Sequence, residues 1–257
     1  MRTPWTICLI DLTTSSTPDS MRPAPFFMGL IEAWTEQITG SFADDVGLLP
    51  VTFQIIADPN DRPAGAVAMN FRDTIPEAPG ALAYHQDTNG VPDIELGVDL
   101  FASLTDQNES LSEGGSHELL EMLRDPGANR WGDKGDGNLC ALESCDIVQN
   151  TQYQASNGIW VSNFALESYF MPGGAGPFDH LGVLTSQSDT SFGYEIQCPA
   201  PTEINQVGGM IGKPSWPQRW HSFERRLAIV GKLTDKQRKQ KSHPHSRAYR
   251  RGLRLAV

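Results

Sequence analysis

The stretch SHELLEML at residues 116–123 decides how the rest of the chain is interpreted. On an α-helix, His117 and Glu121 are four residues apart, so their side chains project from one face about one turn apart. Glu118 lies beside them. Two interpretations stand at this point, because the same pattern is found on ordinary solvated helix faces and in groups of side chains that bind an ion.

A metal site is indicated by comparison with the His-Glu-x-x-His motif. In that motif two histidines hold zinc, and the intervening glutamate is the general base for a metal-bound water. Here Glu121 stands at the position of the second histidine. A carboxylate makes the site harder and more anionic, which weakens its selectivity for Zn²⁺ over Mn²⁺ or Ca²⁺. The pattern therefore predicts one Zn²⁺ ion, or another divalent metal, held by His117 and Glu121 with Glu118 as the base.

The helix that carries these residues has recognisable ends. Ser110 and Glu113 fit the S-x-x-E capping box at its start, and Asp125 with the following Pro-Gly ends it. We expect the helix to cover about residues 112–123. Gly114 and Gly115 have no side chains, so we expect another stretch of backbone to approach closely there.

A catalytic zinc generally needs three protein ligands and one open position. Glu143, which follows His117 by 26 residues, is the candidate third ligand, and Asp146 would accept the N–H of the ligating His117. Asp146 is also an alternative to Glu143 as the ligand. We predict that residues 139–148 form a short helix, and a charged exposed face of that helix is the other explanation of these two carboxylates.

The order of the other predicted elements indicates an α+β fold, in which a mixed twisted sheet packs on helices. An amphipathic helix is expected at residues 26–39, closed by Gly40, and a strand or short helix at residues 159–169. Asp87-Thr88-Asn89-Gly90 is a turn signal between two of the predicted strands. The predicted strands cover residues 5–12, 51–57, 66–72, 81–86, 93–98 and 192–196.

At these residues a resemblance to a known family is visible. His117-Glu118-x-x-Glu121 followed by Glu143-x-x-Asp146 resembles the gluzincin branch of the zincin metallopeptidases. SHELLEMLRDP, ALAYHQDTNGVPDIELGV and IWVSNFALESYF are similar to zincin-like proteins of tailed-phage and bacterial genomes, over about residues 5–194. The resemblance implies a zincin-like fold with metal ligands His117, Glu121 and Glu143, and with Glu118 as the general base.

The resemblance also implies residues around the cleft. The strand at Ala83-Tyr84-His85 would be the edge strand along which an extended peptide pairs. His85 would line the cleft, or it would serve only as a structural hydrogen-bonding residue. A donor for the oxyanion is also needed, and the candidates are Tyr153, His180 and Tyr194.

Charge divides the 257-residue chain into two parts. Residues 219–257 hold 12 of the 20 Lys and Arg residues and only two acids, whereas the rest holds 8 basic and 29 acidic residues. We expect a zincin-like domain at residues 1–198, followed at residues 199–257 by a Pro/Gly-rich linker and a basic tail. Such a tail is typical of an arm that contacts assembly neighbours or nucleic acid, and a solvated tail is the alternative.

Composition restricts the class of protein. No apolar run approaches the roughly 18 residues of a membrane span, and residues 1–12 lack the features of a signal peptide, so we expect no membrane partner and no export. The four cysteines are expected to be free thiols, with a local disulfide as the alternative.

Two functions from different classes follow. One is a metal-dependent peptidase that cleaves a peptide or protein substrate, and the other is a non-catalytic structural component of a phage virion or similar assembly. The expected location is the virion if the chain is phage-encoded, and otherwise the cytoplasm.

Overall fold

A computed structural model gives the structure of the chain. It describes residues 4–14, 22–47, 50–78, 81–88, 90–103, 110–127, 131–133, 139–149, 151–189 and 197–198. The predictions for the basic tail at residues 199–257, for a strand at residues 192–196 and for Tyr194 lie outside these residues.

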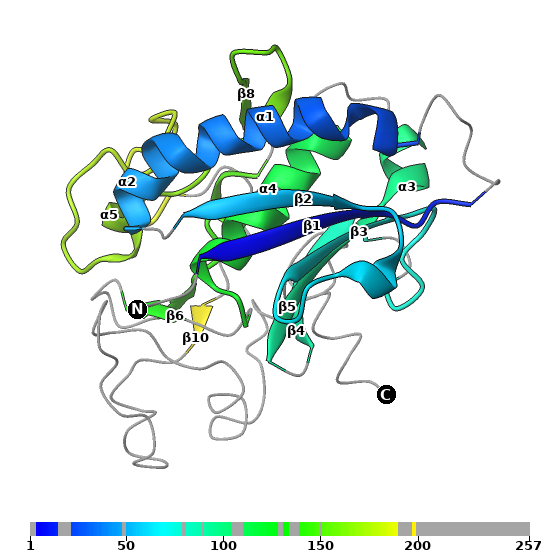
Figure 1. The fold of residues 1–257 in the computed structure, drawn as a ribbon. Coiled ribbons are helices and arrows are strands. Elements are labelled where there is room, and N and C mark those ends of the chain that lie inside the picture. Colours follow the sequence, from blue (N-terminus) through cyan, green and yellow to red (C-terminus); the bar gives the residue numbers. More distant parts are fainter. Residues whose placement is uncertain are drawn as a thin grey trace.

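A five-stranded mixed sheet forms the centre of the fold (Figure 1). Its strand order is β2-β1-β3-β5-β4, in which only β4 runs antiparallel to its neighbour. The predicted mixed sheet packed on helices is therefore confirmed. The strands are β1 (Trp5–Asp11), β2 (Val51–Ile56), β3 (Val67–Arg72), β4 (Ala83–Thr88) and β5 (Val91–Gly97).

Strands β4 and β5 form the predicted hairpin. Asp87 Oδ1 accepts a hydrogen bond from Gly90 N at 2.7 Å, and Gly90 has a φ of 86°, which glycine adopts without steric cost. Among the described residues β4 is the last strand of this sheet, the position that the resemblance implied for Ala83-Tyr84-His85. One side of β4 pairs with β5, and the chain segment around His85 lies on this outermost strand.

Helices α1 (Phe27–Gln37) and α4 (Leu111–Arg124) pack on one face of the sheet (Figure 1). The apolar stripe of α1 meets Ile7 and Leu9 of β1 in the largest core cluster, together with Leu119 and Leu120 of α4. Successive side chains of a strand point to opposite faces. Cys8 and Ile10 accordingly belong to a separate buried cluster.

Gly40 does not close the first helix, which corrects the sequence prediction. After α1 the chain makes a π-helical turn (Ile38–Phe42), in which Gly40 has non-helical dihedrals, and then forms α2 (Ala43–Val46). The left-handed residue that ends this segment is Gly47, with a φ of 61°. Gly40 therefore marks a bend within the helical segment rather than its end.

The start of α4 follows the predicted cap. The Ser110 side chain accepts a hydrogen bond from Glu113 N at 3.1 Å. Gly114 and Gly115, however, face aromatic side chains rather than another backbone. A Cβ at Gly114 would lie 2.2 Å from the Phe101 ring, and one at Gly115 would lie 2.6 Å from the Trp34 ring.

This packing predicts the effect of Gly115→Ala. In an exposed helix the change would stabilise the protein, but here the added methyl group collides with Trp34, which is fully buried and donates to Ser112 O. We expect the free energy of unfolding to fall by about 1–3 kcal/mol in urea denaturation. Thr35→Ala, at an exposed position of α1, is the control and should change it little. An equal effect of the two changes would contradict the packing argument.

Short elements follow α4, and they correct the helix predicted at residues 139–148. That segment consists of a strand, a loop and one 3-10 turn, because Leu139–Ala141 pairs with the preceding strand Trp131–Asp133 and with Gln197–Cys198, which is distant in the sequence. The predicted element at residues 159–169 is divided into a strand and a short helix. The remaining elements are α3 (Val98–Ser103), β6 (Trp131–Asp133), β7 (Leu139–Ala141), β8 (Gln152–Gln154), β9 (Trp160–Ser162), α5 (Glu167–Phe170), β10 (Gln197–Cys198) and 3-10 turns at Ala24–Phe26, Pro59–Asp61 and Asp146–Val148.

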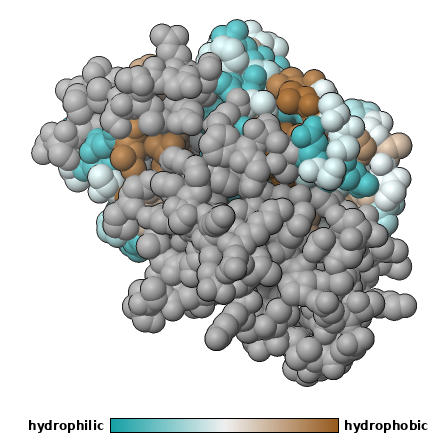
Figure 2. All heavy atoms as spheres, turned by 180° about the vertical axis from the view of Figure 1, so that it is seen from behind, coloured by the Kyte–Doolittle hydropathy of each residue, from teal (hydrophilic) through white to brown (hydrophobic). Residues whose placement is uncertain are grey.

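On the face seen in Figure 2, the coloured residues include hydrophobic side chains interspersed with hydrophilic ones. Every helix among the described residues is too short or too polar for a membrane crossing. Cys8, Cys140 and Cys145 are buried free thiols, so the alternative of a disulfide between Cys140 and Cys145 is wrong.

Candidate metal centre

Helix α4 is buried along almost its whole length. His117, Glu118 and Glu121 are exposed by only 7%, 2% and 0%. The interpretation of this pattern as a solvated surface stripe is therefore wrong. Buried carboxylates are costly unless they are paired, hydrogen-bonded or bound to a metal, so the surroundings of these three residues decide what the helix does.

His117 is enclosed by carboxylates. Its Nε2 lies 3.5 Å from Glu121 Oε1 and 3.3 Å from Asp146 Oδ1. Burial alone would lower the pKa of His117, but the adjacent Asp146 carboxylate and the charge of Glu118 outweigh it and raise the pKa above its ordinary value. The environment of this imidazole thus favours a positive charge, either from a proton or from a metal ion.

Glu121 is held in place by the start of the 3-10 turn that follows β7. The backbone N–H groups of Cys145 and Asp146 donate to Glu121 Oε1 at 3.1 and 3.0 Å. Burial and the neighbouring carboxyls of Glu143 and Asp146 nevertheless raise the pKa of Glu121 well above its ordinary value. The two N–H groups fix the orientation of the side chain, but its negative charge is not neutralised by them.

His85 reaches the same place from the edge strand β4. Its Nδ1 lies 3.1 Å from Glu118 Oε2, and its Nε2 lies 3.1 Å from the carbonyl oxygen of Asp125, the residue that follows α4. A carbonyl oxygen only accepts, so the imidazole donates from Nε2 in this arrangement. His85 therefore contacts both the predicted base and the end of its helix.

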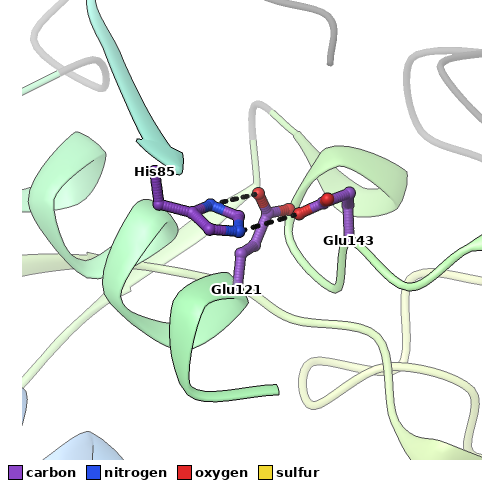
Figure 3. A group of neighbouring side chains, drawn as sticks. All are labelled: His85, Glu121 and Glu143. Atoms are coloured by element: carbon purple, nitrogen blue, oxygen red, sulfur yellow. Dashed lines mark ion pairs between the residues drawn. The ribbon is translucent and has the colours of Figure 1, made fainter. Parts of the chain in front are cut away.

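Glu143 lies in one group with His85 and Glu121 (Figure 3). Figure 3 shows the imidazole facing the carboxylates of Glu121 and Glu143, with His85 Nδ1 3.9 Å from Glu121 Oε2 and Nε2 3.8 Å from Glu143 Oε2. Glu143 is 2% exposed and lies in the loop after β7, not on a helix. The alternative explanation, that Glu143 lies on an exposed helix face, is therefore wrong.

The structure brings these side chains together as two groups that share Glu121. One contains His117, Glu121 and Asp146, and the other contains His85, Glu121 and Glu143, with the ligand atoms of each group within 4.8 Å of one another. The set His117, Glu121 and Glu143 expected from the sequence is not one of these groups. Asp146 joins His117 instead, and His85, expected only to line the cleft, is a candidate ligand.

The chemistry of both groups suits a divalent metal. Each offers one imidazole nitrogen and two carboxylate oxygens, the ligand types of zinc sites that keep an open position. Ligand atoms about 2.0–2.2 Å from an ion lie within roughly 4.4 Å of one another, so only small side-chain movements are needed. Buried His, Glu and Asp side chains can thus hold a metal ion here, while the kind of metal is left open by the ligand set.

Of the expected oxyanion donors, Tyr153 and His180 lie outside both groups. The Tyr153 ring packs on His180, with ring centroids 4.8 Å apart, and His180 stacks on Phe164. Burial raises the pKa of Tyr153 to about 12 and lowers that of His180. These contacts are those of a packed aromatic cluster, so Tyr153 and His180 are candidates for structural roles.

Arg124, at the end of α4, connects the helix to the loops that carry the ligands. It donates to Ser144 Oγ at 3.1 Å and to Ala165 O at 2.8 Å, and it pairs with Asp45 of α2 at 2.6 Å. Ser144 stands directly between Glu143 and Cys145. The buried guanidinium therefore fixes the loop that carries Glu143 and Asp146 relative to α4.

Comparison with family models, with curated proteins and with solved structures found no match for this chain. The functional interpretation consequently depends on the fold and on the geometry of the two ligand groups. The relationship to zincins is a proposal.

Proposed function

We propose that the protein is a metal-dependent peptidase with a zincin-like fold. The observation that carries the proposal is the buried group of His117, Glu121 and Asp146, with Glu118 on the same helix as the first two. A carboxylate directly beside two candidate ligands is in the position of a general base. Because Glu118, His117 and Glu121 all lie on α4, the helix fixes their positions relative to one another.

In this proposal His117, Glu121 and Asp146 would hold the ion. A divalent ion bound there supplies a polarising charge for the scissile carbonyl and an acidified water as nucleophile. Glu118 accepts the proton of that water and returns it to the leaving amine. The backbone N–H groups of Cys145 and Asp146 keep Glu121 oriented throughout.

The edge strand β4 is the proposed binding site for the substrate. Because His85 belongs to β4 and contacts Glu118 at 3.1 Å, a peptide aligned along this strand would bring a scissile bond close to the base. The preference for particular side chains would come from residues near that edge.

The test is cleavage of a peptide library by the full-length chain, monitored by mass spectrometry. We expect cleavage that is lost on chelation and restored by Zn²⁺ or Mn²⁺ but not by excess Na⁺. His117→Ala should be inactive under all of these conditions. Cleavage that persists unchanged in strong chelator, or no cleavage between pH 5.5 and 8.5 with saturating metal, would contradict the proposed function.

The separation of charge along the sequence favours the second candidate, a structural component of an assembly. Residues 219–257 are basic and the rest of the chain is strongly acidic. The basic segment of one chain would therefore attract an acidic surface on a neighbour in the assembly. Deleting residues 224–257 should then leave the folded body intact but unable to join its complex. If the full chain also fails to cleave the library, the assembly function is the one supported.

A further inference from the structure

Glu121 has two carboxylate oxygens that face different groups of ligands. Oε1 lies 3.5 Å from His117 Nε2, on the side of Asp146, and accepts both backbone N–H groups. Oε2 lies 3.9 Å from His85 Nδ1, on the side of Glu143. A carboxylate oriented in this way has the arrangement of a bridge between two cations.

Oε2 of Glu121 is an independent indication that a cation binds on this side of the carboxylate. Glu121 is fully buried, and its Oε2 receives no hydrogen bond from the described residues. A hydrogen bond between the carboxyls of Glu121 and Glu143 would need a proton on one of them. A cation on this side of Glu121 would satisfy the oxygen with both carboxyls ionised.

With all of its carboxyls ionised, the site is balanced better by two divalent ions than by one. Four carboxyl groups, of Glu118, Glu121, Glu143 and Asp146, are at most 3% exposed. If all are ionised, a single divalent cation leaves two negative charges in a buried volume, whereas two divalent cations neutralise the site. Uncompensated buried charge is strongly unfavourable, so the ligand set matches two ions better than one.

We infer that Glu121 bridges two divalent metal ions. The first is held by His117 and Asp146, and the second by His85 and Glu143. This inference rests on the proposed function and adds a second metal to it. Two-metal hydrolytic sites have ions about 3.5–4 Å apart, which a single bridging carboxylate can span.

The surroundings of His85 are compatible with this role. Coordination through Nδ1 leaves the Nε2–H donated to Asp125 O, and a hydrogen bond of that kind fixes the tautomer of a ligating histidine. Coordination of the second ion by Nδ1 would also replace the contact between Nδ1 and Glu118 Oε2. Glu118 would then be released to act as the base once the second ion is bound.

The test is the metal stoichiometry of the full-length chain after removal of metal with chelator. We expect titration calorimetry to give two Mn²⁺ or two Zn²⁺ ions per wild-type chain, and one ion in His85→Ala. Electron paramagnetic resonance of the manganese form should show a spin-coupled pair in the wild type and an isolated Mn²⁺ in the variant. Glu143→Gln, which keeps the shape of the side chain, should repeat the result if His85→Ala does not fold.

A matched control is His180→Ala, which removes a histidine that lies outside both groups and should leave two ions bound. One ion per wild-type chain, with metal-dependent cleavage retained, would overturn the second ion and leave the peptidase standing. Two ions in wild type, His85→Ala and Glu143→Gln alike would also overturn it. A wild-type chain without any bound ion would overturn both proposals.

Discussion

Glu118→Gln is expected to abolish peptide cleavage without removing the metal. The amide has almost the same shape as the carboxylate and can still hydrogen-bond to His85 Nδ1, but it cannot accept a proton from water. Loss of a general base typically reduces the rate by about 10²–10⁴-fold. The measurement is kcat for a peptide found in the library, together with the metal content of the same preparation.

The matched control for this change is Glu77→Gln, at an exposed glutamate outside the site. It should retain wild-type kcat and metal content. If Glu118→Gln cleaves as fast as Glu77→Gln, Glu118 is not the base. If it loses the metal as well as activity, Glu118 is a ligand rather than a base, and its role in the proposal is wrong.

Glu121→Gln is expected to stabilise the metal-free protein while eliminating metal binding. The Gln side-chain oxygen can still accept from the N–H groups of Cys145 and Asp146, and its amide nitrogen can donate to Glu143. Burying a charge costs several kcal/mol even after relaxation, so replacing an uncompensated one by a neutral side chain of similar volume should stabilise the metal-free protein by roughly 1–4 kcal/mol. We expect this gain at pH 8 in chelator, where the wild-type carboxyl is most strongly driven to ionise.

The dependence on pH follows from the raised pKa of Glu121, caused by burial and by Glu143, Asp146 and Glu118. The unfolded chain releases this proton near the ordinary glutamate pKa, whereas the folded protein keeps it to higher pH. Between these values the folded state binds more protons, so the free energy of unfolding of the metal-free wild type falls as pH rises through the raised pKa. The raised pKa of His117 acts in the same direction.

Urea denaturation in chelator at pH 5.5 and pH 8 measures this difference. Glu121→Gln should show a smaller loss of stability between the two pH values than the wild type. Glu77→Gln should behave like the wild type, because that glutamate is exposed. A metal-free wild type whose stability does not change, or rises, over this range would contradict the description of Glu121 as a carboxyl that resists ionisation.

The local features of the fold could be predicted from the sequence. The cap at Ser110, the Pro after Asp125 and the turn before Gly90 are short-range signals, and the corresponding helix and hairpin have nearly the expected bounds. The helix predicted at residues 139–148 is wrong because Leu139–Ala141 pairs on one side with the preceding strand Trp131–Asp133 and on the other with the distant Gln197–Cys198. Such pairing overrides the local pattern of apolar residues.

The site could be predicted only where local spacing determines it. His117, Glu118 and Glu121 share one helix, so their spacing alone brings them together. The position of His85 depends on β4 being the edge strand beside α4, which no local pattern indicates. The relative places of Glu143 and Asp146 depend on the loop and 3-10 turn that replace the predicted helix, and this is why Asp146 rather than Glu143 lies beside His117.

Zinc binding by the metal-free, full-length chain tests the central claim most directly. Titration calorimetry should show saturable binding of at least one ion per wild-type chain, with release of protons, and no binding to Glu121→Gln. A wild-type chain that is folded by circular dichroism yet binds no ion at saturating zinc would contradict the claim that the buried cluster around Glu121 is a metal centre.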